Sequence, residues 1–183
     1  MLTYTIGNYI VEIFDAKPNY TDFINQYDAI YIDDTEYHPA SVVGIRIYED
    51  EEQFKQVAFG TSGGATGVFK SSVIVTDNHI VCCCSDSVFC LSVPELELLW
   101  KTKVDTATAF QIFPLGKDYI IHGELEISRL SGLGEIIWQQ SGADIFTTPD
   151  GTDNDFIITD EYILATDWDG RKYKFNFDGN IIE

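Results

Sequence analysis

The sequence has few positive charges and no long hydrophobic run, and both shortages limit what the protein can bind. Eleven Lys and Arg residues stand against 30 Asp and Glu among 183 residues, which gives a formal net charge of −19. Tight binding to nucleic acid or to anionic lipid needs clustered Lys and Arg that neutralise phosphates. We therefore expect no nucleic-acid partner and no membrane partner, whereas such a negative field attracts basic proteins.

Targeting signals are also missing. Residues 1–14 contain no positively charged start followed by a continuous apolar segment, which marks a secretory signal. No stretch reaches the roughly 20 apolar residues that a membrane-spanning helix requires. The sequence therefore predicts a cytoplasmic protein. Its 45% hydrophobic and 14% aromatic content is typical of a folded globule rather than a disordered chain.

The four cysteines lack the spaced pairs of a disulfide framework or a zinc site. Cys82, Cys83 and Cys84 are consecutive, and Cys90 follows in the same apolar, strand-like stretch. Successive side chains of a strand point to opposite faces, so Cys82 and Cys84 are expected on one face and Cys83 on the other. Because no Cys-x-x-Cys spacing or histidine cluster accompanies them, we expect buried free thiols, no bound metal and no cofactor.

Short β-favouring segments dominate the beginning of the chain. Residues 3–14 alternate around the turn-prone pair Gly7-Asn8 and predict a hairpin or two edge strands. A short helix is expected from Thr21 to Gln26, followed by a strand at residues 29–32. Residues 42–48 alternate between an apolar face and a mixed face, which is typical of a half-buried strand.

An internal repeat occupies the rest of the chain. The segment TDNHIV at residues 76–81 returns as TDEYIL at residues 159–164, and ELLW, which ends at Trp100, returns as EIIW, which ends at Trp138. These matches define three units of near-forty-residue period, each with three expected strands. Repeats of this kind stack into one shared core and align their loops on a common rim. The units cover about residues 73–104, 110–140 and 156–183.

The three units resemble the quinoprotein-type (PQQ-like) β-propeller repeat, in which a Gly-x-x-x-Trp segment follows a pair of hydrophobic strands. The matching segments are residues 134–138, 179–182 and, less closely, 94–100. The resemblance covers residues 70–183 and implies propeller blades. It assigns no functional residue, because complete rings of this family either bind a quinone cofactor or serve only as scaffolds for partners.

The fold class expected from these patterns is mainly all-β, with propeller-like stacked antiparallel blades and one or two short helices. Residues 1–69 are expected to form a strand-rich segment that packs on the repeats at residues 70–183 within a single domain. Three units do not close a ring. Either the N-terminal strands supply further blades, or another chain covers the open end.

Residues 60–67 (GTSGGATG) form a glycine-rich loop with the Gly-x-Ser-x-Gly spelling of a hydrolase nucleophile. The strand-to-helix context of that motif is absent, because strand-like sequence follows the loop. The Gly-Lys-Ser/Thr ending of a phosphate-binding loop is absent as well. A turn is therefore the main interpretation, and anion binding is the alternative.

His122 opens the sequence His-Gly-Glu-Leu-Glu. If this segment is one strand, Glu124 and Glu126 project to the same side and raise the pKa of a nearby carboxyl or imidazole group. A ligand or substrate site at His122 and Glu124 is one interpretation. The other is a turn at the edge of a blade in which every polar group has its partner.

Two carboxylate-rich turns, at residues 150–155 and 167–170, offer the oxygen ligands that Ca²⁺ prefers, although neither has the spacing of a complete ion-binding loop. Asp, Asn and Gly also build turns for local reasons. Trp168 precedes Asp169 outside the repeat pattern, where an exposed indole is a common binding anchor. Asp144 lies in the connection between the second and third units, and we expect it to contribute to recognition.

Together these features favour a non-catalytic acidic interaction protein that binds a basic protein partner through its loop rim. One version is an inhibitor or immunity protein that neutralises a basic toxin or nuclease. An alternative is a small hydrolase, or a sugar- or ion-binding module, that uses His122, Glu124 and the Asp-rich turns. A structural assembly subunit that forms oligomers is a further alternative. No catalytic residue is assigned.

Overall fold

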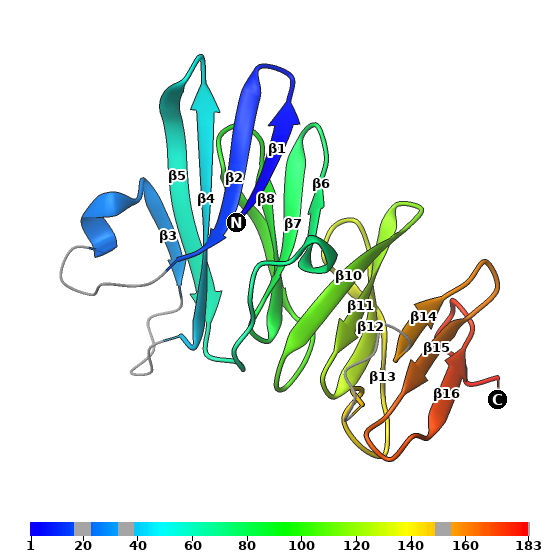
Figure 1. Cartoon of the computed structure of the whole chain (residues 1–183). Helices are drawn as coiled ribbons and strands as arrows, with labels where there is room; N and C mark the ends of the chain where they lie inside the picture. The colour runs from blue at the N-terminus through cyan, green and yellow to red at the C-terminus, as the bar shows by residue number, and fades with distance from the viewer. Residues whose placement is uncertain (17–22, 33–38, 149–154, 183) are drawn as a thin grey trace.

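The computed structural model describes residues 1–16, 23–32, 39–148 and 155–182 of the chain. Within these ranges, nearly all regular structure is β-strand, arranged in four sheets that follow one another in sequence and in space (Figure 1). We number the sheets 1 to 4 from the N-terminus. The mainly all-β, propeller-like fold predicted from the sequence is confirmed. No helix in the described ranges is long and apolar enough to cross a membrane.

Sheet 1 contains five strands in the order β1-β2-β4-β5-β3. The predicted hairpin is confirmed, and Gly7 takes a φ of 57° in its turn. The predicted strand at residues 29–32 is present and pairs in parallel with its neighbour. The bounds are β1 (Leu2–Ile6), β2 (Tyr9–Asp15), β3 (Ala29–Ile32), β4 (Ser41–Glu49) and β5 (Glu52–Thr61).

The helix expected from Thr21 to Gln26 is only partly covered by the described residues. Phe23–Gln26 forms a short 3-10 helix, η1. Thr21 itself lies outside the described residues, as do the carboxylate-rich residues 150–154.

Sheets 2 and 3 each contain four antiparallel strands in sequential order, and sheet 4 contains three. A bridge between Phe175 and Ile181 extends sheet 4 beyond its last strand. Sheet 2 follows the 3-10 helix η2 (Lys70–Ser72) and has β6 (Val73–Val75), β7 (His79–Cys84), β8 (Ser87–Ser92) and β9 (Leu98–Lys103). Sheet 3 has β10 (Ala109–Leu115), β11 (Asp118–Gly123), β12 (Glu126–Leu130) and β13 (Ile136–Ser141); sheet 4 has β14 (Phe156–Ile158), β15 (Ile163–Thr166) and β16 (Lys172–Phe175).

The prediction of three strands per unit is wrong for the first two units. In the first unit, β7 and β8 are joined by Ser85 and Asp86, a turn without glycine or proline. Ser85 takes a φ of 53°, the left-handed conformation that a two-residue hairpin turn requires. Its N–H donates to the hydroxyl of Thr66, and its carbonyl accepts from the N–H of Ala109. Contacts with distant segments therefore impose this turn.

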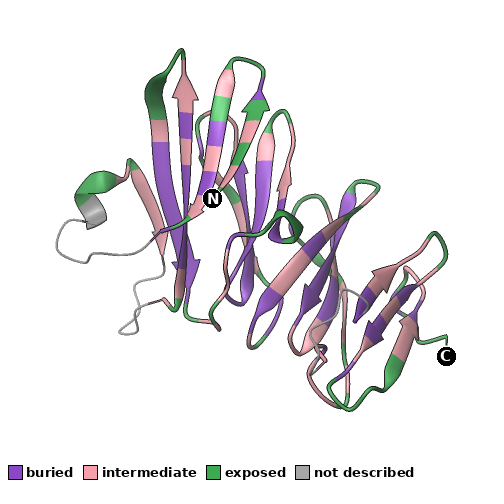
Figure 2. Cartoon of the chain, in the orientation of Figure 1, coloured by how far each residue is buried: buried purple, intermediate pink, exposed green. Residues whose placement is uncertain are grey.

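Three hydrophobic cores fill the spaces between successive sheets (Figure 2). Strand β7 contributes to two of them, because its side chains alternate. Cys82 and Cys84 pack in the core between sheets 1 and 2, and Cys83 packs between sheets 2 and 3. The predicted division of the cysteines between two faces is confirmed, and all four thiols are free and buried. Sheets 2 and 3 are thus covered on both faces.

A repeated contact between tryptophan and glycine joins sheets 2, 3 and 4. Gly134 of sheet 3 packs so closely on Trp100 of sheet 2 that an added Cβ would lie 2.5 Å from the indole ring. Gly179 of sheet 4 is related in the same way to Trp138 of sheet 3, at 2.6 Å. Trp138 also donates from its indole N–H to the carbonyl of Phe177, at 2.9 Å. The repeated tryptophans are therefore contacts between blades.

Candidate functional site

The residues that the sequence singled out meet at one end of sheets 3 and 4. Glu124 forms the turn between β11 and β12, and its carbonyl accepts from the N–H of Phe146 at 2.6 Å. Trp168 forms the turn between β15 and β16, and its N–H donates to the carbonyl of Ile145 at 2.9 Å. The connection that contains Asp144 therefore lies between the two turns. We call this set (Glu124, Asp144, Trp168, Asp169) the acidic rim.

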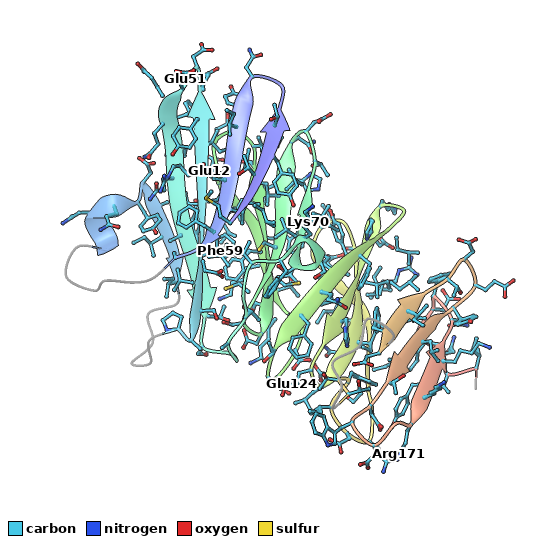
Figure 3. The ribbon with its side chains drawn as sticks, viewed as in Figure 1. Glu12, Glu51, Phe59, Lys70, Glu124 and Arg171 are labelled. Carbon is cyan, nitrogen blue, oxygen red and sulfur yellow. The ribbon has the colours of Figure 1, made fainter. Side chains whose placement is uncertain are left out.

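Figure 3 shows Glu124 and Arg171 at this same end of the two sheets. The indole of Trp168 is 46% exposed. The guanidinium of Arg171 bonds the carboxylates of Asp167 and Asp169, at 3.1 and 2.6 Å. Asp167 itself is fully buried and also accepts from the hydroxyl of Tyr173. One cation thus pairs with two carboxylates of this turn, and the charged residues of the acidic rim itself are all negative.

The carboxylate of Asp167 therefore makes hydrogen bonds and an ion pair within its own turn. The carboxylates of the 167–170 turn thus have a local structural explanation. Asp167 also accepts from the backbone N–H of Arg171, at 2.9 Å. These hydrogen bonds and the nearby positive charge hold the pKa of Asp167 below its usual value, despite burial. Across the residues that the structure describes, no group of three His, Cys, Asp or Glu side chains is placed as metal ligands would be.

Glu126 is separated from Glu124 by the end of the turn, which corrects the expectation that both lie on the same side of one strand. Strand β11 ends at Gly123 and β12 begins at Glu126. Burial raises the pKa of Glu126, and the nearby Asp105 raises it further. The sequence pattern failed here because the turn, Glu124-Leu125, contains no glycine, proline or asparagine to mark it.

Asp105 is a structural residue that the sequence reading missed. It is buried, and one oxygen accepts from the N–H groups of Ala107 and Thr108 at 2.6 and 3.1 Å. The other accepts from those of Leu125 and Glu126 at 2.9 and 3.0 Å. One carboxylate thereby fixes the connection between sheets 2 and 3 to the turn that carries Glu124.

His122 lies beneath the rim rather than on it. Its Nε2–H donates to the carbonyl of Phe146 at 2.7 Å, and its Nδ1 lies 2.9 Å from the side-chain amide of Gln111. The ring stacks on Phe156 with centroids 4.4 Å apart and packs edge-on against Phe110 at 5.7 Å. Burial lowers the pKa of His122 to about 4, so the ring is neutral near pH 7.

A neutral ring that donates from Nε2 leaves Nδ1 as an acceptor, and the NH₂ group of Gln111 satisfies it once the side-chain amide, whose Oε1 lies 2.9 Å from Nδ1, is turned over. Both nitrogens of His122 are then engaged. A general base needs a nitrogen within reach of the substrate proton, and here reaching one would require displacing a partner. The geometry therefore gives His122 a positioning role, in which it supports the backbone of Phe146.

His122 also lines a cavity of about 340 Å³. The cavity lies between the segment that leads into β6, the first residues of β10 and the start of β14. Its wall contains three phenylalanine rings as well as polar side chains, and Glu124 is not among the lining residues. The lining residues are Ala65, Thr66, Gly67, Phe69, Ser71, Phe110, Gln111, His122, Thr147, Asp155 and Phe156.

Sequence reasoning missed the cavity because its walls come from segments far apart in the chain. Phe69 and Phe110 carried no motif. Asp155 belonged to the carboxylate-rich turn but was not distinguished from its neighbours. The only available signal was His122 itself, a histidine that follows three apolar strand residues.

The glycine-rich segment at residues 60–67, predicted to be a loop throughout, begins within β5, which continues to Thr61. Its glycines have a structural explanation. A Cβ on Gly63 would lie 2.5 Å from the backbone nitrogen of Asp86, and one on Gly64 would overlap the hydroxyl of Thr108. The N–H of Gly64 donates to the carbonyl of Ala107 at 2.8 Å. These glycines therefore allow the loop to approach the turn of sheet 2 and the following connection closely.

No protein-family model matches the sequence, and no curated protein matches it. Among solved structures, the chain is similar to the computationally designed Ika8 protein, with a TM-score of 0.53 and 9% identity over 99% of this chain and 59% of that one. It is also similar to BamB from Moraxella catarrhalis, with a TM-score of 0.48 and 15% identity over 83% of this chain and 47% of that one. The chain spans about half the length of these proteins, and at such low identity the likeness to Ika8 shows the propeller-like fold alone.

Proposed function

We propose that the protein is an acidic interaction protein that binds a basic protein partner through the acidic rim. The observation that carries the proposal is the exposed indole of Trp168 in a rim whose other residues are Glu124, Asp144 and Asp169, in a chain whose formal net charge is −19. Exposed tryptophans are frequent anchors of protein interfaces. An indole face beside carboxylates suits Lys or Arg, which gain both a cation–π contact and an ion pair.

The construction of the rim also supports this proposal. Glu124, Asp144 and Trp168 come from three segments that backbone hydrogen bonds tie together, so the surface is formed before a partner arrives. A preformed surface loses less conformational entropy on binding. The resemblance of the repeats to PQQ-like propellers agrees with the proposal, because some members of that family serve as scaffolds for partners.

The first experiment is affinity capture of the tagged protein from its native lysate at low and at moderate salt, with the retained proteins identified by mass spectrometry. A stoichiometric basic protein that is lost as salt rises is the expected result, since salt screens exposed charge pairs. Retention that salt does not alter would contradict electrostatic recognition.

Variants then locate the interface. Trp168→Ala and Glu124→Lys should each reduce capture of that partner by at least tenfold. The matched controls are Leu133→Ala and Glu135→Lys, because both residues are exposed in the turn between β12 and β13, on a different turn of sheet 3. Equal losses in the rim variants and in the controls would show that net charge alone, rather than the rim, determines binding.

A narrower form of the proposal makes the protein an inhibitor or immunity protein for a basic toxin or nuclease. It rests on charge complementarity. If the captured partner is toxic when expressed alone, co-expression of this protein should restore growth, and co-expression of the Trp168→Ala variant should not. Equal rescue by both proteins would remove the rim from the explanation.

Assembly into oligomers is a second candidate function, favoured by the outer face of sheet 4. Tyr162, Leu164, Lys172 and Lys174 surround a hollow of about 250 Å³ there, and the ammonium group of Lys174 lies 4.5 Å from the ring centre of Tyr162. No other described sheet packs on this face. Light scattering should then report more than one chain per particle, and Leu164→Asp should yield a monomer. A monodisperse monomer of the unmodified protein would exclude this function.

A further inference from the structure

The His122 cavity combines a carboxylate with aromatic rings and has no basic residue in its described lining. Asp155 is buried and lines the cavity, and its Oδ2 accepts from both the N–H and the hydroxyl of Thr148, at 3.0 and 2.6 Å. None of the described lining residues is Lys or Arg, and Asp155 is the one Asp or Glu among them. Because His122 is neutral near pH 7, it adds no positive charge to this described lining.

The aromatic wall is partly open to solvent. Phe69 is 64% exposed even though its ring lies against the backbone of Gly67, where an added Cβ would approach to 2.9 Å. Phe110 is half-buried on another side of the same cavity. An exposed phenylalanine at a hollow offers a ring face to a bound group, and positively charged groups are attracted to such faces.

From this arrangement we infer that the cavity binds an organic cation, an ammonium or guanidinium group, between the carboxylate of Asp155 and the rings of Phe69 and Phe110. Phosphate and carboxylate ligands are disfavoured, because the described lining offers them no Lys or Arg. The group belongs either to a free small molecule or to a Lys or Arg side chain of the basic partner. Only the second source rests on the proposed function.

The polar groups of the cavity are held in place before a ligand enters. The hydrogen bonds from Thr148 orient the carboxylate of Asp155, and the side-chain amide of Gln111 lies against His122, with Oε1 2.9 Å from Nδ1. His122 is in turn fixed by the carbonyl of Phe146 and by stacking on Phe156. His122 is therefore a positioning residue of this site, and a bound cation would contact its neighbours.

The test is an NMR titration of the full chain with methylguanidinium and methylammonium, and with methylurea and glucose as neutral probes. The expected result is saturable shifts of the amides of Ala65 and Gly67 and of the side-chain amide of Gln111 with the cations, and at least tenfold weaker binding of the neutral probes. Equal binding of methylurea or glucose would overturn the inference, and so would cation shifts confined to the acidic rim.

Two variants test the assigned groups. Asp155→Asn should weaken methylguanidinium binding at least tenfold, and Phe69→Ala should weaken it several-fold. Phe69 is mostly in solvent, so its variant retains the fold and keeps the inference falsifiable if Asp155→Asn does not fold. Phe54→Ala, which removes another exposed ring on sheet 1, is the matched control. Unchanged affinity in Phe69→Ala would contradict the inference.

The same variants separate the two sources of the cation. If the cation is a partner side chain, Phe69→Ala reduces partner capture as well as methylguanidinium binding. If it is a free small molecule, Phe69→Ala leaves partner capture unchanged. Trp168→Ala tests only the proposed function, since Trp168 does not line the cavity and its variant leaves the methylguanidinium shifts of the Gln111 side-chain amide intact. Loss of one activity without the other therefore identifies which proposal has failed.

Discussion

Asp105 and His122 stabilise the candidate site through hydrogen bonds to backbone groups. Asp105 satisfies four N–H groups from two segments, and His122 satisfies the carbonyl of a third. Buried backbone groups that lose their partners cost free energy. At the scale of single residues, the polar side chains beneath the rim therefore position its backbone, and the side chain of Trp168 stays exposed.

Replacement of Asp105 tests whether its carboxylate positions the backbone beneath the rim. Asp105→Asn keeps one acceptor oxygen and turns an NH₂ group toward two backbone donors, so we expect the free energy of unfolding to fall by about 2–4 kcal/mol. Urea unfolding followed by circular dichroism measures the change. Asp178→Ala, at an exposed turn, should alter stability by less than about 0.5 kcal/mol. Similar small effects in both variants would show that Asp105 does not hold the connection.

The pH dependence of stability tests His122. The pKa of His122 is about 4 in the folded protein, against the ordinary value of 6.5 that applies in the unfolded chain. Between these two values the unfolded chain binds more protons, so stability falls as the pH is lowered. From pH 7.5 to pH 5 this group alone should remove about 2 kcal/mol. The loss measured for His122→Gln over the same range should be smaller by that amount. Parallel pH curves for the two proteins would contradict the assignment.

At the scale of the sheets, the repeated Trp–Gly contact joins one blade to the next. Each glycine has a positive φ, near 80°, and lies directly against the indole of the preceding blade. A hydrogen bond from Thr102 to the carbonyl of Gly134, at 2.6 Å, accompanies the first contact. The conformation and the close approach both require glycine.

The matched pair Gly134→Ala and Gly170→Ala separates those two requirements. Both glycines have nearly the same φ, 81° and 80°, but a Cβ on Gly170 meets nothing within 4 Å. Gly170→Ala should cost roughly 1 kcal/mol through backbone strain alone. Gly134→Ala should cost about 2 kcal/mol more, because it displaces the indole of Trp100. If thermal unfolding showed equal losses of unfolding free energy in the two variants, the indole of Trp100 would move aside without cost.

Which segments form strands, and which side chains share a face, could be predicted from the sequence, because both follow from local patterns. The strand at residues 29–32 and the hairpin at residues 3–14 follow from short β-favouring segments and the turn pair Gly7-Asn8, and the division of the cysteines follows from a period of two. The turn at Ser85 could not be predicted, since its conformation depends on Thr66 and Ala109. The cavity could not be predicted either, because three connections must fold before its walls meet.

At the scale of the whole molecule, the sheets differ in how much of their surface is covered. Sheets 2 and 3 take part in two cores each, whereas the described part of sheet 4 packs on sheet 3 through one. In stacked repeats, the stability of a unit is approximately its own contribution plus that of its interfaces. Sheet 4 is therefore expected to unfold locally before sheets 2 and 3.

Native-state hydrogen exchange measures this order. Strands β11 and β15 form a fair comparison, because each lies between two hydrogen-bonded neighbours. The amides of β15 should exchange at least tenfold faster than those of β11, since sheet 4 opens locally while sheet 3 stays closed. Equal protection of both strands would show that the four sheets unfold only as one unit.

The position of the cysteines allows the sheet interfaces to be monitored without labels. Cys82 and Cys84 lie between sheets 1 and 2, and Cys83 and Cys90 lie between sheets 2 and 3. Burial raises the pKa of all four thiols, that of Cys90 to about 11, so each stays protonated and inert toward alkylating reagents while its core is closed. Peptide mapping after a brief iodoacetamide pulse would therefore reveal which interface opens first during denaturation, that between sheets 1 and 2 or that between sheets 2 and 3.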